Sequence, residues 1–394
     1  MELNAPLSQV KIVDFDCGIA GSFCAKLLAE LGAQVIKVET TTQGNVCRHI
    51  GPRIGSDSEE TVSALHLYLN ANKKGLKVNL KNSDSIEILS QLMNWGNIVI
   101  EDHPPGYMDS ISLGYNNISK SNPDLVMTSI TSFGQTGPYN QYESSELIVQ
   151  ALSGMLSNNG TEDREPLRFP RYQANFAAGA NAAGVTLAAL QYSRITGKGQ
   201  FIDVSIQESV AGFYYSNHSL YTYTGMKSPS RGGKELYRTK DNGWAMPLKG
   251  RAEWDNYALF FDAIELLEEK YLTPQGQQLH AQEIQDILSE KILEMNKHDV
   301  VQGGQEAGYP FGMVQTLEEV LNCPQVEFRN HFDKVDHPNA GEATYSRLPF
   351  KLSSSDLPIT TNAPKIGENN EEILRTILNY DNDEIIKLQQ DNVI

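Results

Sequence analysis

The feature that most constrains the fold is a strand–turn–helix–strand pattern within the first forty residues. An apolar strand is predicted at 10–15, and two glycines follow it in a turn. Apolar side chains then recur at helical spacing over 22–31, Gly32 ends that helix, and a second strand is predicted at 34–39. Such a unit folds as two parallel strands joined by a right-handed crossover. Its glycines do not form the GxGxxG pattern, so a dinucleotide-binding fingerprint is absent.

The alternation of strands and helices continues through the first half of the chain. Further strands are predicted at 76–80, 97–101, 125–130 and 201–204, and helices at 85–95, 146–156 and 176–192. Repeated alternation favours an α/β fold, with a parallel sheet covered by helices on both faces.

The composition changes after about residue 215. Residues 221–243 are rich in Gly, Ser, Lys and Tyr and lack periodicity, and helices are predicted at 253–270 and 282–295. This region is predicted to be a second domain flanked by linkers, and a final helix is predicted at 369–378.

Charge and composition exclude several classes of function. The 394 residues carry 32 Lys and Arg against 49 Asp and Glu, a net charge of −17, which disfavours nucleic acid and anionic membranes as partners. No apolar run is long enough to span a membrane, and the first residues lack the features of a secretory signal. The four cysteines form no CxxC pair and no metal-binding spacing, so we expect reduced thiols, no metal site and a cytoplasmic protein.

One basic cluster stands out against the acidic total. Its members are Lys37, Arg48, Arg53, Lys73, Lys74, Lys77 and Lys81. Such a cluster can bind a phosphorylated cofactor, although lysines that only keep a surface loop hydrated are an equally good interpretation.

Short motifs in a fixed order give the chain a resemblance to a known family. They are 31–39 (LGAQVIKVE), 69–74 (LNANKK), Pro105-Gly106 with Leu113-Gly114-Tyr115, Asn122-Pro123, 134–138 (GQTGP), 150–154 (QALSG), 196–200 (TGKGQ), 348–350 (LPF) and 363–368 (APKIGE). In this order they resemble the class III CoA-transferases, which include formyl-CoA:oxalate and carnitine CoA-transferases and α-methylacyl-CoA racemase. The resemblance implies a Rossmann-like large domain from 1–215 and 340–394, a small domain with linkers at 216–339, and a dimer of two interlocked rings.

The position that matches the family's nucleophile is an asparagine. The stretch Tyr172 to Gly179 resembles the active-site turn in which an aspartate attacks an acyl-CoA thioester, and Asn175 stands at the place of that aspartate. An amide has no carboxylate and cannot form the acyl anhydride of that mechanism. Asn175 is therefore predicted to be inactive, either as an N-cap of the following Ala- and Gly-rich helix or as a contact to a bound thioester.

Other family positions also depart from the pattern. Ser145 and Glu146 stand where racemase relatives place the first residue of a proton-transferring His and Asp pair. Thr40 and Ser110 replace basic residues that contact CoA phosphates in many members, and Ile19 replaces a CoA-contacting glutamine.

The resemblance still implies a set of residues that bind coenzyme A or an acyl-CoA as substrate. These are Ala20, Lys73, Lys74, Val78, Lys81, Asp102 and His103. Gly232 and Gly233 resemble a glycine loop that closes over the site in some transferases, and an ordinary flexible linker is the alternative. Like His49 and His218, His103 shows no triad or metal spacing and fits a structural role equally well.

The resemblance implies a subunit of a CoA-transferase that acts on small carboxylic acids, with succinyl-CoA as a common donor. Because several residues of one site are lost, we expect a homologous partner subunit to supply the aspartate, as in the two-subunit benzylsuccinate CoA-transferase. Three alternatives remain: an Asp-to-Asn variant of an active homodimer, a racemase or lyase that uses Glu143 or Glu146, and a protein that binds CoA esters without chemistry.

Overall fold

A computed structural model describes residues 5–40, 43–55, 61–160, 164–226, 235–251, 253–338 and 340–394. The chain divides into two compact units. Unit 1 contains residues 1–159, 165–228 and 329–394, and unit 2 contains 160–164 and 229–328. The sequence-based boundaries lay near 215 and 340, so the helix after 215 and the segment 329–339 fall in unit 1.

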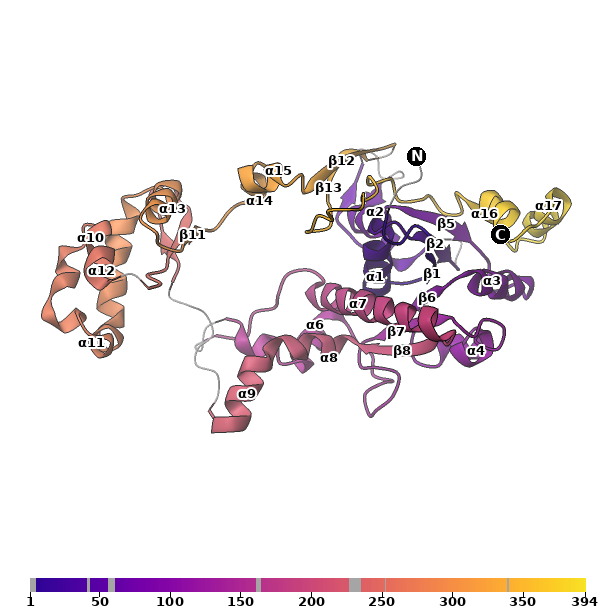
Figure 1. Cartoon of the computed structure of the whole chain (residues 1–394), viewed down its shortest axis with the longest axis horizontal. Coiled ribbons are helices and arrows are strands. Elements are labelled where there is room, and N and C mark those ends of the chain that lie inside the picture. Colours follow the sequence, from indigo (N-terminus) through magenta and orange to yellow (C-terminus); the bar gives the residue numbers. More distant parts are fainter. Residues whose placement is uncertain are drawn as a thin grey trace. The chain divides into compact units, whose positions relative to one another are not determined.

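Unit 1 is built on a six-stranded parallel sheet (Figure 1). Its strands are β1 (Lys11–Phe15), β2 (Gln34–Glu39), β5 (Lys73–Lys77), β6 (Ile98–Glu101), β7 (Val126–Thr131) and β8 (Gln200–Ser205). They lie in the order β5-β2-β1-β6-β7-β8, so the chain moves outward in one direction from β1 and in the other from β6. The predicted α/β class with a parallel sheet is confirmed.

Helices cover both faces of this sheet. On one face apolar side chains of α1 (Ile19–Glu30), α6 (Glu146–Leu152), α7 (Gln173–Thr196) and α8 (Ile206–Ala211) share a core with the sheet. On the other face the core includes side chains of α3 (Asp84–Trp95), α4 (Tyr107–Ser110), α5 (Tyr115–Ile118), α16 (Asn370–Thr376) and α17 (Asn382–Gln390). The last two helices lie beside β5 in Figure 1, so the two ends of the chain build one domain.

Smaller elements complete unit 1. They are α2 (Ala64–Asn70), α9 (Tyr215–Thr224), the 3-10 turns η1 (Val46–Arg48), η2 (Leu156–Asn158) and η3 (Gly212–Tyr214), and the antiparallel pairs β3 (Arg53–Ile54) with β4 (Val62–Ser63) and β12 (Phe332–His337) with β13 (Gly341–Ser346).

The small residues of α7 allow it to pack closely against α1. A Cβ atom added to Gly179 would lie 2.6 Å from the carbonyl oxygen of Ala20 and 3.1 Å from the ring of Phe23. Glycine costs about 1 kcal/mol of helix propensity relative to alanine, and here the cost is offset by close helix–helix contact. The Ala- and Gly-rich composition of this helix is therefore explained by a neighbouring element.

Unit 2 has its own core. It consists of the antiparallel strands β9 (Tyr237–Arg238), β10 (Trp244–Pro247) and β11 (Phe311–Met313), the helices α10 (Trp254–Phe260), α11 (Pro274–Leu279), α12 (Ala281–Leu293), α13 (Lys297–Glu306), α14 (Leu317–Leu321) and α15 (Pro324–Phe328), and the turns η4 (Ile264–Leu267) and η5 (Glu269–Tyr271). Aromatic rings of Tyr257, Phe261 and Phe311 fill the core.

Three secondary-structure predictions were wrong in detail. The helix predicted at 253–270 is interrupted and becomes α10, η4 and η5. The strand predicted at 76–80 lies three residues earlier, as β5. Helix α17 was missed altogether. None of the described helices is both long and apolar enough to cross a membrane.

Candidate active site

The main cavity lies where the sheet order reverses, between the carboxyl ends of β1 and β6. It has a volume of about 940 Å³ and is lined by segments that follow these strands, by the 43–50 segment, by 130–132 at the end of β7, by 140–144, and by Asn175 at the start of α7. All of these residues belong to unit 1. In open α/β sheets ligands bind at this reversal point, so the cavity is the candidate active site.

One wall of the cavity is formed by the first turn of α1 and the carboxylate that caps it. Asp102 Oδ1 accepts the Gly18 N–H at 2.7 Å, and Oδ2 accepts the Gly21 N–H at 3.1 Å. Burial raises the pKa of the Asp102 carboxyl, and the Gly18 hydrogen bond opposes that shift. The helix N-terminus, which is otherwise a favourable site for an anion, is thus occupied by a side chain of the same protein.

His103 follows Asp102 and is held by its ring. Its Nε2 lies 3.1 Å from the carbonyl oxygen of Phe15, and the imidazole stacks on Tyr107 with ring centroids 4.4 Å apart. Its backbone N–H donates to Glu101 Oε2 at 2.9 Å. His103 therefore presents a fixed aromatic surface to the cavity.

The other wall contains Asn175 and its neighbour Glu146. Asn175 Nδ2 donates to Glu146 Oε2 at 2.6 Å, and the Asn175 backbone N–H reaches the same oxygen at 3.2 Å. Glu146 Oε1 accepts the backbone N–H of Ala174 at 2.8 Å and Nε2 of Gln150 at 2.7 Å. This carboxylate from α6 therefore caps α7 and holds the Asn175 amide through four hydrogen bonds in all.

The prediction that Asn175 is the N-cap of its helix was wrong. Helix α7 begins at Gln173 with Tyr172 in the cap position, and no side chain of Tyr172 bonds to the helix. Asn175 is thus the third residue of the helix, and the capping role falls to Glu146. Its side chain is free to point along the cavity wall, where its amide meets a carboxylate.

Two hydroxyl groups of the cavity were missed by sequence reasoning. Thr131 Oγ1 and Ser144 Oγ are inaccessible to solvent and have no hydrogen-bond partner within the described part of the chain. Buried hydroxyls are nearly always paired, so these two are candidates to bind a polar group of a ligand. The position of Thr131 at the carboxyl end of a parallel strand was the available signal.

The residues predicted to bind CoA fall into two groups. Ala20, Asp102 and His103 line the main cavity. Lys73, Lys74, Val78 and Lys81 do not line it. Gly232 and Gly233 lie outside the described residues.

Lys73 lies in a buried ionic cluster beneath α1. Its Nζ contacts Asp14 Oδ2 at 2.8 Å and Asn70 Oδ1 at 3.0 Å, while Lys37 Nζ contacts the other Asp14 oxygen at 3.1 Å. Burial alone would raise the pKa of Asp14, but the charges of Lys37 and then Lys73 outweigh it and lower that pKa to about 2. The ammonium group of Lys73 thus compensates a buried carboxylate.

The other three residues of this group differ in exposure. Val78 is fully buried, and Lys74 forms an exposed ion pair with Glu372. Lys81 is exposed, and its side chain has no ion pair within the described residues. Their predicted contacts with CoA remain predictions.

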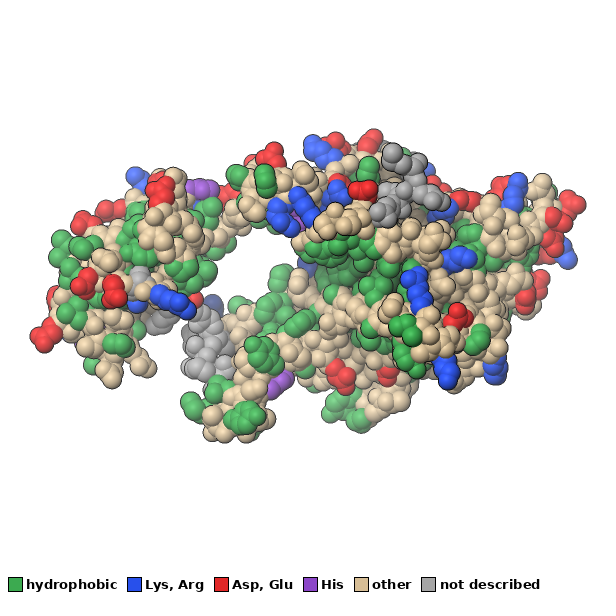
Figure 2. Space-filling model, in the orientation of Figure 1, with side chains coloured by type: hydrophobic (Ala, Val, Ile, Leu, Met, Phe, Trp, Pro, Cys, Tyr) green, Lys and Arg blue, Asp and Glu red, His purple; other side chains and the backbone are tan. Residues whose placement is uncertain are grey.

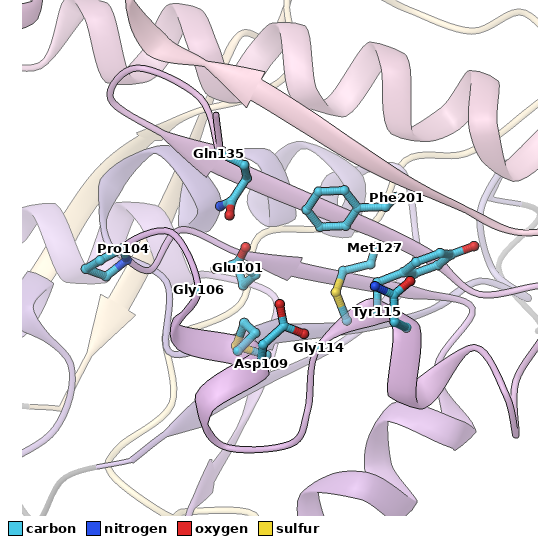
Figure 3. A pocket seen from close by; sticks show the side chains of 11 residues that line it. Glu101, Pro104, Gly106, Asp109, Gly114, Tyr115, Met127, Gln135 and Phe201 are labelled. Carbon is cyan, nitrogen blue, oxygen red and sulfur yellow. The ribbon is translucent and has the colours of Figure 1, made fainter. Parts of the chain in front are cut away.

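A smaller cavity of about 180 Å³ lies on the other side of the β6 terminus (Figure 3). Figure 3 shows the carboxyl groups of Glu101 and Asp109 and the amide of Gln135 around it, with the rings of Tyr115 and Phe201 along one side. Burial raises the pKa of Glu101 to about 7, although hydrogen bonds from Ser129 and His103 oppose the shift. No group of three His, Cys, Asp or Glu side chains in the described residues is arranged to hold a metal ion.

Comparison with known proteins identifies the family. The model of CoA-transferase family III matches residues 7–370. The chain belongs to this family. It is 29% identical over 399 residues to the human succinyl-CoA:glutarate CoA-transferase, covering 99% of this chain and 90% of the relative.

Two further relatives are subunits of larger enzymes. The BbsE subunit of the succinyl-CoA:(R)-benzylsuccinate CoA-transferase of Thauera aromatica is 29% identical over 397 residues, with 94% of each chain covered. The beta subunit of the succinyl-CoA–L-malate CoA-transferase of Chloroflexus aurantiacus is 27% identical over 404 residues, covering 99% of this chain and 98% of the relative.

A solved structure supports the family fold of the CoA-transferase homologue. A CAIB/BAIF family protein from Brucella suis superposes with a TM-score of 0.86 and 26% identity, over 95% of this chain and 99% of the other. The resemblance stated from the sequence motifs is confirmed.

Proposed function

We propose that this chain is the subunit without the nucleophile in a heteromeric class III CoA-transferase, which moves CoA between small carboxylic acids. A homologous partner subunit supplies the aspartate. The observation that carries the proposal is the Asn175 amide on the cavity wall, bound at 2.6 Å to Glu146. The subunits among the relatives, BbsE and the beta subunit of the malate enzyme, lend further support.

The chemistry belongs to the partner's carboxylate in this proposal. That carboxylate attacks the thioester carbonyl of the donor, which expels CoA thiolate and leaves an acyl anhydride. The thiolate then attacks the enzyme's carbonyl, releases the donor acid and leaves CoA on the aspartate. The acceptor carboxylate and the thiolate complete the same two steps in reverse order, so no proton or electron is left over.

Glu146 does not replace the missing nucleophile. Both of its oxygens accept two hydrogen bonds each, from Ala174, Asn175 and Gln150. Donors of this kind stabilise the anion and reduce its basicity and its nucleophilicity. The same argument disfavours Glu146 as the base of a racemase or lyase.

A partner subunit is also supported by an unpaired aromatic helix. None of the residues of α9 is buried, and Phe213, Tyr215, Tyr221, Tyr223 and Met226 in and around it are more than half exposed. Figure 2 shows apolar side chains on this helix at the face of unit 1. Large exposed apolar groups of this kind mark protein interfaces.

Succinyl-CoA is the donor we propose, because three of the relatives named above are named for it. The acyl-CoA is proposed to lie in the main cavity against Ala20, Asp102 and His103. Lys74 and Lys81 are the exposed lysines proposed to reach its phosphates, while Lys73 and Val78 act through the buried structure that supports them.

The test is purification of this protein from its own host, with native mass and subunit identity determined by mass spectrometry. A one-to-one complex with an aspartate-bearing homologue that transfers CoA is expected. Replacement of the partner's aspartate by asparagine should abolish transfer, whereas Asn175→Asp in this chain alone should not create it. A homodimer of this chain that transfers CoA without any partner would overturn the proposal.

A further inference from the structure

A separate cavity of unit 1 carries a positive charge that is unusual for so acidic a chain. Its volume is about 290 Å³, and three segments distant in sequence build it: 48–53, 61–67, and the returning chain at His337 and 363–365. Its lining includes Arg48, Arg53 and Lys365 and no Asp or Glu among the described residues. An anion is the ligand that such a lining attracts.

Not all of this charge is compensated by neighbouring carboxylates. Arg48 is neutralised by Glu39, whose two oxygens accept Nε and Nη2 at 2.8 Å each. Arg53 instead donates to neutral oxygens of Thr61 and Arg48. Within the described ranges neither Arg53 nor Lys365 forms a side-chain ion pair.

A buried histidine supplies an unused donor to the same cavity. His66 is 2% exposed, and its Nδ1 accepts Asn70 Nδ2 at 3.0 Å, which assigns the proton to Nε2. In the described structure Nε2 has no hydrogen-bond partner, since the nearby Pro364 carbonyl accepts Arg48 Nη2 at 2.9 Å. Burial, then the charges of Arg48 and the buried lysines, lower the pKa of His66 to about 2, while the Pro364 carbonyl opposes this shift, so the ring is a neutral donor.

The remaining wall of the cavity is apolar. Val62, Leu67, Ala363 and Pro364 form it, opposite the basic groups. Inorganic phosphate would leave this wall unused, whereas a short aliphatic chain would cover it.

From the cationic rim, the orphan N–H of His66 and the apolar wall, we propose that this cavity binds a small aliphatic carboxylate. The carboxylate accepts from Arg53 and from His66 Nε2, and its chain packs on Val62 and Pro364. The site is distinct from the main cavity, but His49 lines both, so an occupant would contact a residue of the candidate active site. The proposal does not depend on the absence of a nucleophile at Asn175.

The experiment is calorimetric titration of the full-length protein with butyrate, in parallel with butyramide and inorganic phosphate. One equivalent of butyrate should bind, while butyramide should not, because it lacks the charge. Arg53→Gln and His66→Phe should each weaken butyrate binding about tenfold. Lys120→Gln removes an exposed cation outside the cavity and should change nothing.

Further variants separate this site from the main cavity. Thr131→Val alters the main cavity and should leave butyrate binding intact; if it removes binding, the carboxylate lies in the main cavity and the proposal is wrong. Equal affinity for phosphate and butyrate, no butyrate binding, or retention of full affinity by Arg53→Gln would each overturn it. Arg53 is exposed, so its variant is expected to fold even if His66→Phe does not.

Discussion

Two helix N-termini face the main cavity, and each is capped by a carboxylate from a different part of the same chain. Asp102 at the end of β6 accepts two backbone N–H groups of α1, and Glu146 of α6 accepts two of α7. The two caps differ in what else they bind. Asp102 bonds only to backbone in the described residues, whereas Glu146 also binds the side chains of Asn175 and Gln150.

This difference separates a structural feature from a functional one. The α1 cap closes a tight turn: a Cβ atom on Gly21 would lie 2.6 Å from Cys17 Sγ and 3.2 Å from Asp102 Oδ2, so the turn has no room for a larger residue. The α7 cap lies beside the position where the family carries its nucleophile, and its binding of Asn175 depends on the residue found there. Substitutions at the two caps should therefore have different consequences.

The largest effect is expected from removal of the α1 cap. Asp102→Ala leaves the N–H groups of Gly18 and Gly21 without their acceptor, and the free energy of unfolding should fall by about 3 kcal/mol. Urea unfolding followed by circular dichroism measures this. Asp124→Ala removes an exposed carboxylate and is the matched control, with a change expected within about 0.5 kcal/mol. Equal stability of the two variants would show that α1 does not need its cap.

The neighbouring carboxyl on the α1 side should make stability depend on pH. Burial raises the pKa of Glu101 from 4.5 to about 7. Between these values the folded protein keeps a proton that the unfolded chain has lost, so stability falls as pH rises from 4.5 to 7 and is fully present below 4.5. The loss attributable to Glu101 should be about 2 kcal/mol.

Glu101→Gln isolates this contribution. The variant cannot ionise at position 101, so its stability should decline less across that range than that of the unmodified protein. Stability curves measured at several pH values test the sign. Parallel curves for the two proteins would mean that Glu101 ionises normally.

How far the sequence could predict these caps depends on the distance over which they act. The unit at 10–39 was predictable because its apolar spacing and glycines are local, and the family motifs extended this to the whole fold. The Asp381 and Glu384 capping box was a local signal for α17 that was overlooked. In contrast, the contact between Glu146 and Asn175 joins two helices across 29 positions, and no periodicity reports it.

Burial of lysines was unpredictable for a related reason. Lys73 lies on the edge strand β5 and has the pattern of a surface residue, yet the tertiary fold places Asp14 of β1 beside its ammonium group. A charge is buried only with a partner, and the partner is 59 positions away in sequence. The functional interpretation of a lysine motif thus needed the fold.

A second carboxylate at the α7 cap should destabilise the protein in a pH-dependent way. Asn175→Asp replaces the donor that meets Glu146 at 2.6 Å with a like charge, and at pH 8 the free energy of unfolding should fall by about 1.5 kcal/mol. The repulsion raises the folded-state pKa of the carboxyl pair, so the loss should disappear as pH falls and the pair takes up a proton.

Adding Glu146→Gln to this variant should restore most of the loss at pH 8, because the repulsion needs both charges. Thermal unfolding at two pH values tests both statements. A variant as stable as the unmodified protein at pH 8 would show that the pocket accommodates two carboxylates without cost.

The smallest effect is expected from neutralising the α7 cap alone. Glu146→Gln keeps one carbonyl acceptor for α7 but turns an NH₂ group toward a donor, either the Ala174 N–H or the Asn175 amide. Because the side chain is only partly buried, water can replace part of the loss, and the expected destabilisation is about 1 kcal/mol. Urea unfolding beside Asp102→Ala measures the ratio of the two caps. If Glu146→Gln proves the more destabilising of the two, the α7 cap is the structural one, and the binding of Asn175 serves the fold rather than the site.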